Sequence, residues 1–543
     1  MSPKHFLYSS FLFASVVALT NACGAEGEPG NPEGGNGGTL ETSAGAGGGN
    51  GEGTGGKHGP NHDGDDAGSG GNGGSTFTTT TSTEPAGGAG GGGGSSDAGA
   101  GGMTIQCMDS GIPQVLYMSS DDSSSMGSPA IARDYLEAGL APPMDLIRPW
   151  EFLNYYRVRF PAPEKPTLGI HANFAPTEGG DYRLQIGVQA FQPARPKMAL
   201  TFVVDTSGSL VGEGIAREQE AIVAIAGQLA KGDRVSFVTW ANDGEILLQD
   251  HEIEGPNDPA LLATTEALLP GGGSDLHAGL MRGYALAAAM ADEETRLSRV
   301  VLMSDGGANV GVVDKDAIAL AAKNGDDKGI YLIGIGIGPA TGYSDALMNT
   351  VTDAGRGAYV FLDSEGEAQE ILGDRFDEVM DIAARSVRVK VTLPSYFEFK
   401  EFNGELVSSD PSKVPPQHLA PGDSMIFDQI LKLSPGGALC ANDAITVETL
   451  WENPFLHKSE APTHATWSSA IKDIEGETWQ LLKSEAVVRY ARMLATRDHL
   501  EYEAAQAAVS KALASPDVTQ DPFWTELEDI EALIQKFPAA ELK

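Results

Sequence analysis

The sequence predicts a doubly wound, Rossmann-like α/β domain that is inserted between β-rich, sandwich-like segments and followed by C-terminal helices. Two observations lead to this fold class. Between residues 196 and 372, short apolar runs alternate with amphipathic stretches of helical length, which is the order of a mostly parallel sheet covered by helices on both faces. The first apolar run, residues 198–204, ends directly in a cluster of oxygen-bearing side chains.

Composition and pattern divide the chain into five parts. These are an export signal (1–22), a glycine-rich linker (23–102), an N-terminal associated domain (103–195), the α/β domain (196–372) and a C-terminal associated domain (373–543). The linker contains almost no large apolar residue, so it cannot bury enough surface to offset its chain entropy. We expect a disordered tether with a mean reach of about 50 Å.

The first residues have the pattern of an export signal. Lys4 and His5 precede an apolar run from residue 6 to 19, which is short for a bilayer span, and Ala22 stands before Cys23. This resembles a bacterial lipoprotein signal, which implies that Cys23 becomes lipidated and that the lipid is the protein's only membrane contact. Gly24 in such signals implies the outer membrane, on its periplasmic or cell-surface side, and plain secretion is the alternative.

Charge and cysteine content exclude several classes of protein. The formal net charge of −39 disfavours binding to nucleic acid through a basic patch. The chain has three cysteines and no C-x-x-C motif, which excludes the common zinc and redox motifs. With Cys23 assigned to lipid, Cys107 and Cys440 remain on either side of the α/β domain. We hypothesise a disulfide between them, with two buried thiols as the alternative.

The α/β domain has a regular order of elements. Residues 198–204 form the first strand because they are almost all apolar or β-branched, as in the middle of a parallel sheet. Further strands are predicted at residues 233–240, 246–248, 299–304, 329–337 and 358–362, and helices at residues 213–230, 276–290, 314–323 and 344–354.

The flanking segments have a different periodicity. Short helices are predicted at residues 130–139 and 148–156, then an antiparallel hairpin between residues 168 and 188 with one dry face. After a linking helix at residues 368–384, period-two strands return at residues 387–393, 425–433 and 444–450. We infer one β-sandwich built from both flanks of the α/β domain. The segment from residue 484 to 537 is helical, with apolar faces that serve for docking.

The candidate functional residues lie where the first strand ends. Asp205, Ser207 and Ser209 occupy alternate positions, so one carboxylate and two hydroxyls can converge, and Gly208 permits the tight turn. Hard oxygen ligands of this kind suit Mg²⁺.

Two later loops supply further oxygens. A glycine loop at residues 270–275 contains Ser274 and opens a helix, and the strand at residues 299–304 ends at Asp305. Ligands of open α/β sheets bind where strand ends and the following loops meet. We therefore expect these side chains to lie near Asp205.

These residues resemble the von Willebrand factor type A (VWA) domain with its metal-ion-dependent adhesion site (MIDAS). The resemblance implies that Ser207, Ser209 and Ser274 are direct ligands of Mg²⁺, or of Mn²⁺ or Ca²⁺, and that Asp205 and Asp305 act partly through water. Ser274 stands where the family has Thr, and Leu210 where Met is common. Neither departure removes an oxygen ligand.

The resemblance extends over residues 119–537 to the bacterial exported VWA proteins of the YfbK type. It is carried by Tyr135-Leu136 with Gly139, by Pro142-Pro143, by residues 148–156 and 299–311, and by Asp521-Pro522-Phe523. That family has a small N-terminal domain, a central VWA domain and a characteristic C-terminal domain.

Three functions follow from these features. The first is non-enzymatic binding, in which an acidic residue of a protein partner completes the metal shell. The second is a structural scaffold with a metal-independent VWA domain. The third, a hydrolytic enzyme, lacks a G-x-S-x-G elbow, an H-E-x-x-H motif and a P-loop, and only His277 lies near the site loops as a candidate base. We expect no small-molecule substrate.

Overall fold

The computed structural model describes residues 111–121, 124–241, 244–291, 295–326, 329–455 and 462–543. The predicted export signal, the glycine-rich linker, Cys23 and Cys107 lie outside these residues, so those assignments stay predictions. Within the described residues no helix is both long and apolar enough to cross a membrane.

The central domain is built on a six-stranded sheet with the order β6-β5-β4-β7-β8-β9. Strand β4 lies inside the sheet and pairs in parallel with β5 and β7, whereas β6 is an antiparallel edge strand. The predicted α/β fold is therefore confirmed. The strands are β4 (Lys197–Asp205), β5 (Arg234–Trp240), β6 (Ile246–Glu252), β7 (Arg296–Ser304), β8 (Ile330–Ile337) and β9 (Tyr359–Leu362).

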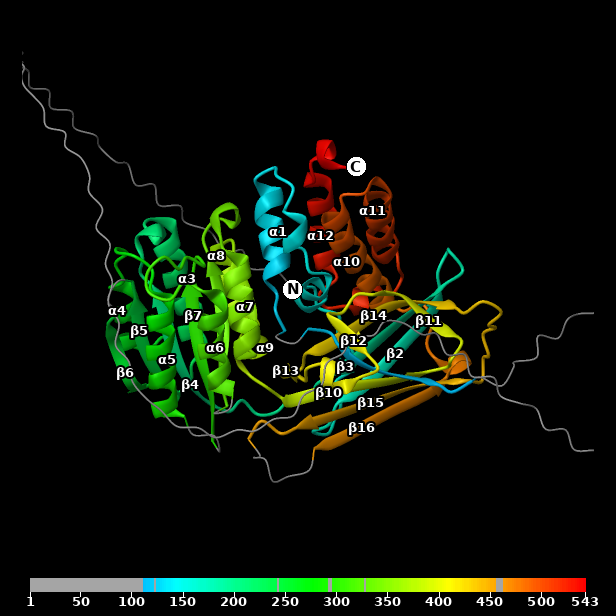
Figure 1. The fold of residues 1–543 in the computed structure, drawn as a ribbon, viewed down its shortest axis with the longest axis horizontal. Coiled ribbons are helices and arrows are strands. Elements are labelled where there is room, and N and C mark those ends of the chain that lie inside the picture. Colours follow the sequence, from blue (N-terminus) through cyan, green and yellow to red (C-terminus); the bar gives the residue numbers. More distant parts are fainter. Residues whose placement is uncertain (1–110, 122–123, 242–243, 292–294, 327–328, 456–461) are drawn as a thin grey trace, which may run out of the picture. The chain divides into compact units, whose positions relative to one another are not determined.

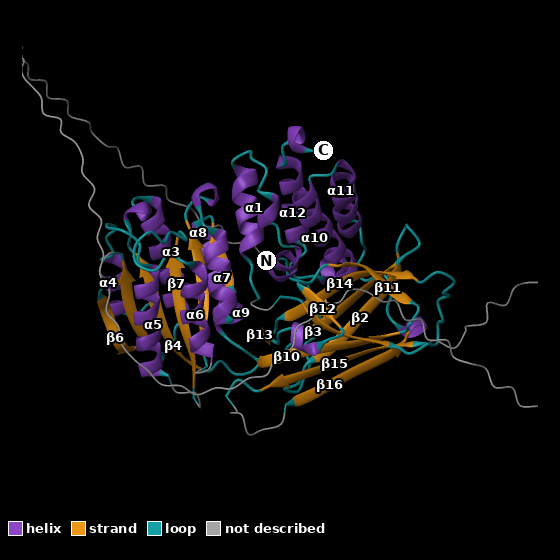
Figure 2. Ribbon diagram, viewed as in Figure 1, coloured by secondary structure: helices purple, strands orange, loops and turns teal. Residues whose placement is uncertain are grey.

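Helices cover both faces of this sheet (Figure 2). Neighbouring residues of β4 enter different cores: Phe202 belongs to the same core as Ile222 of α3 on one face, and Val203 to the same core as Leu280 of α5 on the other. The helices are α3 (Glu213–Gln228), α4 (Pro259–Glu266), α5 (Leu276–Met290), α6 (Lys315–Asp326) and α7 (Asp345–Gly355).

The flanking strands form two further sheets, ordered β12-β1-β10-β15-β16, with β13 on β10, and β11-β14-β3-β2. One hydrophobic core joins them, with Ile186 of β3, Val389 of β10 and Val447 of β15 among its members. The strands are β1 (Gln114–Ser119), β2 (Gly169–Pro176), β3 (Tyr182–Gln189), β10 (Ala384–Leu393), β11 (Phe397–Phe402), β12 (Leu406–Ser408), β13 (Gln417–Leu419), β14 (Ser424–Leu433), β15 (Ala444–Glu452) and β16 (Thr463–Ala470).

The two flanks of the α/β domain meet in this sandwich. Strand β3 precedes the domain in sequence and β14 follows it, yet they pair antiparallel over eight residues from Ser424–Gln189 to Leu431–Tyr182 (Figure 1). The prediction of one sandwich interrupted by the α/β domain is therefore confirmed.

The remaining helices pack on these bodies. Arg148, directly before α2 (Pro149–Tyr155), donates hydrogen bonds of 2.8 Å from both terminal nitrogens to Asp345 of α7. Phe152 of α2 packs edge-on against Tyr490 at 5.5 Å between ring centroids. The other helices are α1 (Gly127–Glu137), α10 (Trp479–Thr496), α11 (His499–Leu513) and α12 (Thr525–Lys536).

Two sequence predictions were wrong, and one helix was missed. Strand β3 is buried on both faces, because Gln185 points away from the sandwich core and donates to the carbonyl of Gln480 in α10 at 2.9 Å. The linking helix is three pieces, α8 (Glu365–Ala368), a π-helical turn (Gln369–Asp374) and α9 (Phe376–Met380), and Ala384 already begins β10. Helix α4 was missed, although Asp258 caps it by accepting from two backbone N–H groups.

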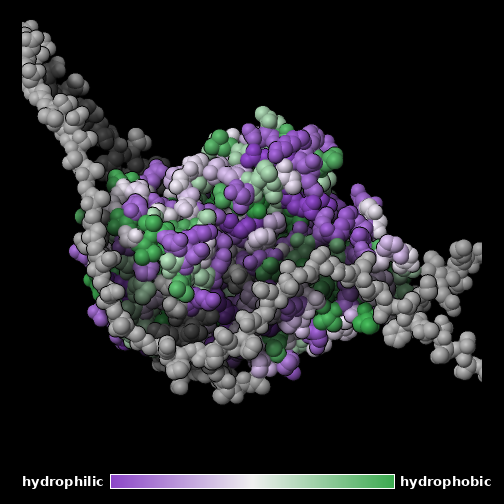
Figure 3. Space-filling view, in the orientation of Figure 1, coloured by the Kyte–Doolittle hydropathy of each residue, from purple (hydrophilic) through white to green (hydrophobic). Residues whose placement is uncertain are grey.

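Cys440 is buried beside the sandwich core with 3% of its surface exposed. Since Cys107 lies outside the described residues, the disulfide between the two stays a prediction. On the face drawn in Figure 3, hydrophobic residues occur as small patches between hydrophilic ones.

Candidate metal centre

The candidate metal centre begins with Asp205, the last residue of β4. Asp205 is fully buried, and its two carboxylate oxygens are held by different donors: Oδ1 accepts from the backbone N–H of Ser207 at 2.8 Å, and Oδ2 accepts from the hydroxyl of Ser304 at 2.9 Å. Burial raises the pKa of Asp205 to about 7; the negative charge of Asp305 adds to this, and the hydrogen bonds from Ser207 and Ser304 oppose it. The carboxylate is thus fixed in a position where its charge is poorly solvated.

The two predicted serine ligands lie together in the loop after β4. The hydroxyl oxygens of Ser207 and Ser209 are 2.9 Å apart, Ser207 being buried and Ser209 exposed. A short 3-10 turn at Gly208–Leu210 brings them to the same side. The alternate spacing in the sequence therefore produces the expected pair of neighbouring hydroxyls.

The glycine loop closes against this turn. The N–H of Gly208 donates to the carbonyl of Gly272 at 3.0 Å, and the N–H of Gly271 donates to the carbonyl of Thr206 at 2.7 Å. A side chain on Gly208 would meet the Gly272 carbonyl oxygen at 3.3 Å. These backbone contacts place the loop that carries Ser274 beside the loop that carries Ser207.

Ser274 is buried and held by the loop that follows β7. Its N–H donates to the side-chain oxygen of Asn309 at 3.0 Å, and its carbonyl accepts from the N–H groups of Asn309 and Val310 at 3.1 and 3.0 Å. Asn309 was not among the predicted site residues, although it lies in the segment 299–311 that carries the family resemblance.

Asp305 faces the same space. Its Oδ1 accepts from the N–H of Gly307 at 2.9 Å. A methyl group on Gly307 would lie 2.9 Å from Asp305 Oδ1 and 3.9 Å from the hydroxyl of Ser274. Gly307 therefore lies beside both the Ser274 hydroxyl and the Asp305 carboxylate.

These residues fit a divalent cation of the Mg²⁺ type. In the part of the chain that the structure describes, no group of three or more His, Cys, Asp or Glu side chains is arranged to hold a metal. A cation at this centre would rely on the hydroxyls of Ser207, Ser209 and Ser274, with Asp205 and Asp305 supplying negative charge. Mg²⁺ accepts such oxygens and keeps several waters.

One carboxyl near the centre was missed from the sequence. Glu218 in the second turn of α3 is fully buried, and neither of its oxygens makes a hydrogen bond of normal geometry. Burial first, then the charges of Asp205 and Asp305, raise its pKa well above the ordinary value. The sequence contained an indication of this carboxyl, because a glutamate at position 218 interrupts the apolar face of the helix between Ile215 and Ile222.

The loops of the centre also carry exposed aliphatic side chains. Val211 follows the serine pair with 68% of its surface exposed, Leu269 precedes the glycine loop with 82%, and Val313 follows Asp305 with 56%. Each of the three loops with predicted ligands therefore carries at least one exposed aliphatic side chain. His277, the candidate base, is the second residue of α5 and half-buried.

Comparison with known proteins identifies the class of the central domain. The family model of the von Willebrand factor type A domain matches residues 199–374, so the chain contains a VWA domain. It is 28% identical over 279 residues to the uncharacterized protein YfbK of Escherichia coli (strain K12), covering 49% of this chain and 48% of that protein. It is 24% identical over 204 residues to inter-alpha-trypsin inhibitor heavy chain H3 of Pongo abelii, covering 36% of this chain and 23% of that protein.

The chain thus spans about half the length of YfbK and about a quarter of that heavy chain. Among solved structures, the von Willebrand factor type A protein from Catenulispora acidiphila is 12% identical with a TM-score of 0.43, covering 70% of this chain and 97% of that one.

Proposed function

We propose that this protein is a non-enzymatic, metal-dependent protein-binding protein of the bacterial cell envelope. The observation that carries the proposal is the convergence of three loops at the ends of β4 and β7, which bring two adjacent serine hydroxyls, the Ser274 hydroxyl and two carboxylates together. VWA domains typically mediate protein–protein interaction and adhesion, and the oxygens of the predicted ligands in this domain support such a role.

The neutral hydroxyls explain why a partner would be recognised through an acidic residue. When bound, a divalent cation supplies a coordination position for an oxygen anion from outside the protein. Ser207 and Ser209 hold their hydroxyls at 2.9 Å from one another without adding negative charge. Asp205 is restrained by Ser207 and Ser304, so its charge stays behind the serines and the outer side is left for the partner's carboxylate.

The surface around the centre supports a protein as the partner. The exposed side chains of Val211, Leu269 and Val313 lie on the three loops that carry the predicted ligands. An acidic residue on a partner surface with aliphatic neighbours would contact both the cation and these side chains. The Cys23 lipid anchor, with secretion as its alternative, would place this binding surface outside the cytoplasm.

The first test is calorimetric titration of the protein with Mg²⁺ and Mn²⁺, beside the Asp205→Ala variant. We expect one site that the substitution abolishes. The matched control is Asp250→Ala, because Asp250 is a half-exposed aspartate on β6 of the same sheet that pairs with Arg234. Absence of binding in a folded wild-type protein would reject the proposal in favour of a metal-independent scaffold.

The envelope location is tested separately. Metabolic labelling with radioactive palmitate is expected to label the wild-type protein and not a Cys23→Ser variant. Labelling of neither protein, with both found in the culture medium, would replace the lipoprotein by a secreted protein.

A further inference from the structure

Most buried cationic side chains of this protein lie against a carboxylate. Arg148 contacts Asp345 at 2.8 Å, Arg183 contacts Asp428 at 2.6 Å, and Lys483 contacts Asp521 at 2.6 Å. This is the expected arrangement, because an unpaired buried charge costs several kcal/mol of unfolding free energy. One arginine of the central sheet departs from it.

Arg299 lies near the start of β7, at the end of the strand opposite to Asp305, and only 2% of its surface is exposed. Its Nη1 donates to the carbonyl of the preceding Ser298 at 3.3 Å, and its guanidinium lies 5.2 Å from the centre of the Tyr331 ring. No carboxylate of the described residues lies within ion-pair distance of it. Burial accordingly lowers the pKa of Arg299 to about 10.

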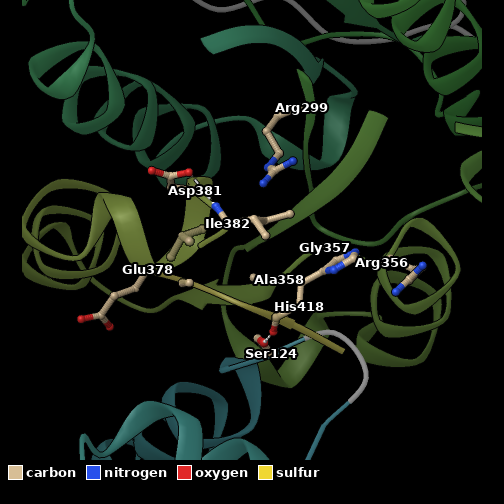
Figure 4. A pocket seen from close by; sticks show the side chains of 11 residues that line it. Ser124, Arg299, Arg356, Gly357, Ala358, Glu378, Asp381, Ile382 and His418 are labelled. Atoms are coloured by element: carbon tan, nitrogen blue, oxygen red, sulfur yellow. Dashed lines mark hydrogen bonds between the residues drawn. The ribbon is translucent and has the colours of Figure 1, made fainter. Parts of the chain in front are cut away.

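A small cavity adjoins this guanidinium, with a free volume of about 30 Å³. It lies where the VWA domain meets the sandwich, because Arg299 comes from β7, Arg356 from the end of α7 and His418 from β13. Figure 4 shows Arg299 reaching from its strand toward the middle of the pocket. One water molecule needs roughly 10–15 Å³ measured this way, so the cavity has room for two or three waters or a small ligand.

His418 offers a second donor on the cavity wall. Its Nδ1 accepts a hydrogen bond from the backbone N–H of Ser386 at 3.3 Å, which places the proton of the neutral ring on Nε2. Nε2 is buried with no hydrogen-bond partner in the described part of the chain. Burial, together with the positive charges of Arg356, Arg299 and Arg385, lowers the pKa of His418 well below its ordinary value, so the neutral ring with its Nε2–H donor is the form present.

The carboxylates around the cavity do not satisfy these donors. Glu378 accepts from Arg375 at 2.7 Å and also pairs with Arg159, and its side chain points away from the pocket in Figure 4. Asp381 Oδ1 accepts from the N–H of Ile382 at 2.7 Å. Burial raises the pKa of Asp381 to about 7, against the opposing effects of the Ile382 hydrogen bond and the positive charge of Arg299, so the negative charge near Arg299 is reduced around neutral pH.

We propose that this cavity binds a small monovalent anion, a halide or a carboxylate of the size of formate, through Arg299 with the Nε2–H of His418 as a further donor. Such an anion provides a negative charge for the Arg299 guanidinium and a hydrogen-bond acceptor for the Nε2–H of His418. Because the cavity wall comes from both the VWA sheet and the sandwich, occupancy stabilises the contact between them. The site lies at the opposite end of β7 from the metal centre, so this inference does not depend on the proposed metal function.

The test is thermal unfolding of the full chain at constant ionic strength, with sodium gluconate replaced stepwise by sodium chloride, sodium formate or sodium phosphate. We expect a saturable rise in Tm of about 2–4 °C with chloride or formate, and the more effective of the two identifies the source. Phosphate exceeds the cavity volume and is expected to give no saturable rise. An equal rise with all three salts would overturn the proposal.

Variants and diffraction locate the site. Arg299→Met is expected to lose the saturable rise, whereas Arg234→Met, which alters a partly exposed arginine on the same sheet, is expected to keep it. An unchanged rise in Arg299→Met contradicts the proposal. Should Arg299→Met not fold, wild-type crystals soaked in sodium bromide decide the question. An anomalous peak between Arg299 and His418 supports the site, and water alone in the cavity refutes it.

Discussion

Some buried charges of the VWA domain lack the ion-pair partners that buried charges of the sandwich and its helices have, although Asp233 of the VWA domain pairs with Arg195. In the sandwich, Arg183 of β3 faces Asp428 of β14, and both side chains are almost fully buried. In the VWA domain, Asp205 and Glu218 near one end of the sheet and Arg299 at the other are equally buried, yet none has an opposite charge within ion-pair distance among the described residues. Of the unpaired charges, Asp205 lies at the proposed metal centre and Arg299 at the proposed anion cavity, which is where perturbed buried groups are expected to meet a ligand.

The largest expected effect concerns the paired charge. Asp428→Ala leaves the Arg183 guanidinium buried without its main partner, and we expect a loss of about 3–5 kcal/mol in the free energy of unfolding. Urea unfolding followed by circular dichroism measures it. Asp181→Ala is the control, because Asp181 pairs with the half-exposed Lys400 and such surface pairs contribute about 0–1 kcal/mol. Equal losses in the two variants would remove the distinction between the two regions.

The next prediction concerns the unpaired carboxyl of Glu218, whose replacement is expected to raise the free energy of unfolding instead of lowering it. Glu218→Leu is expected to increase the free energy of unfolding by about 1–3 kcal/mol at pH 7 in the presence of EDTA, because it removes a buried carboxyl without a partner. The raised pKa of Glu218 means that the unfolded state releases its proton first as the pH rises above about 4.3. Wild-type stability then falls relative to the variant.

The gain from Glu218→Leu is therefore expected to shrink when urea unfolding is repeated at pH 4. Glu220→Leu serves as the control, since Glu220 lies on the same helix, is partly exposed and pairs with Arg217 at 2.8 Å. Destabilisation by Glu218→Leu at pH 7 would show that this carboxyl has a structural partner after all.

A third prediction concerns the metal centre directly. A cation must compete with the proton that Asp205 holds below a pKa of about 7, so Mn²⁺ affinity is expected to fall by up to about tenfold between pH 7 and pH 6. Between pH 8 and pH 9 it is expected to stay nearly constant. Calorimetry in buffers of matched ionic strength measures the affinity, and a pH-independent affinity would contradict the role of Asp205.

The smallest expected effect tests the presence of Ser274 at the position where the VWA family has Thr. Ser274→Thr keeps the hydroxyl and adds the methyl group that stiffens the side chain, so Mn²⁺ affinity is expected to change by less than about threefold, or about 0.6 kcal/mol. Ser274→Ala removes the oxygen and is expected to weaken binding much more. If both variants bind as the wild type does, Ser274 is not a ligand.

Much of the central domain could be predicted from the sequence, because all of its strands except the edge strand β6 are buried on both faces. Residues 198–204 form an almost entirely apolar, β-branched-rich run that predicts an interior strand, and β4 has these residues inside the sheet. The cluster of Asp205, Ser207 and Ser209 was found for the same reason, since polar residues directly after such a strand must lie at its carboxyl end.

The tertiary structure decided what local patterns do not contain. The burial of Gln185 on the outer face of β3 depends on α10, which follows it by some three hundred residues. The unpaired states of Glu218 and Arg299 depend on which side chains α3, β7 and β13 bring near them. The sequence by itself determined the order of strands and helices, the chemistry of the loop after β4 and the interruption of the sandwich. The tertiary packing alone decided which buried charges form ion pairs, because such pairs join residues that are distant along the chain.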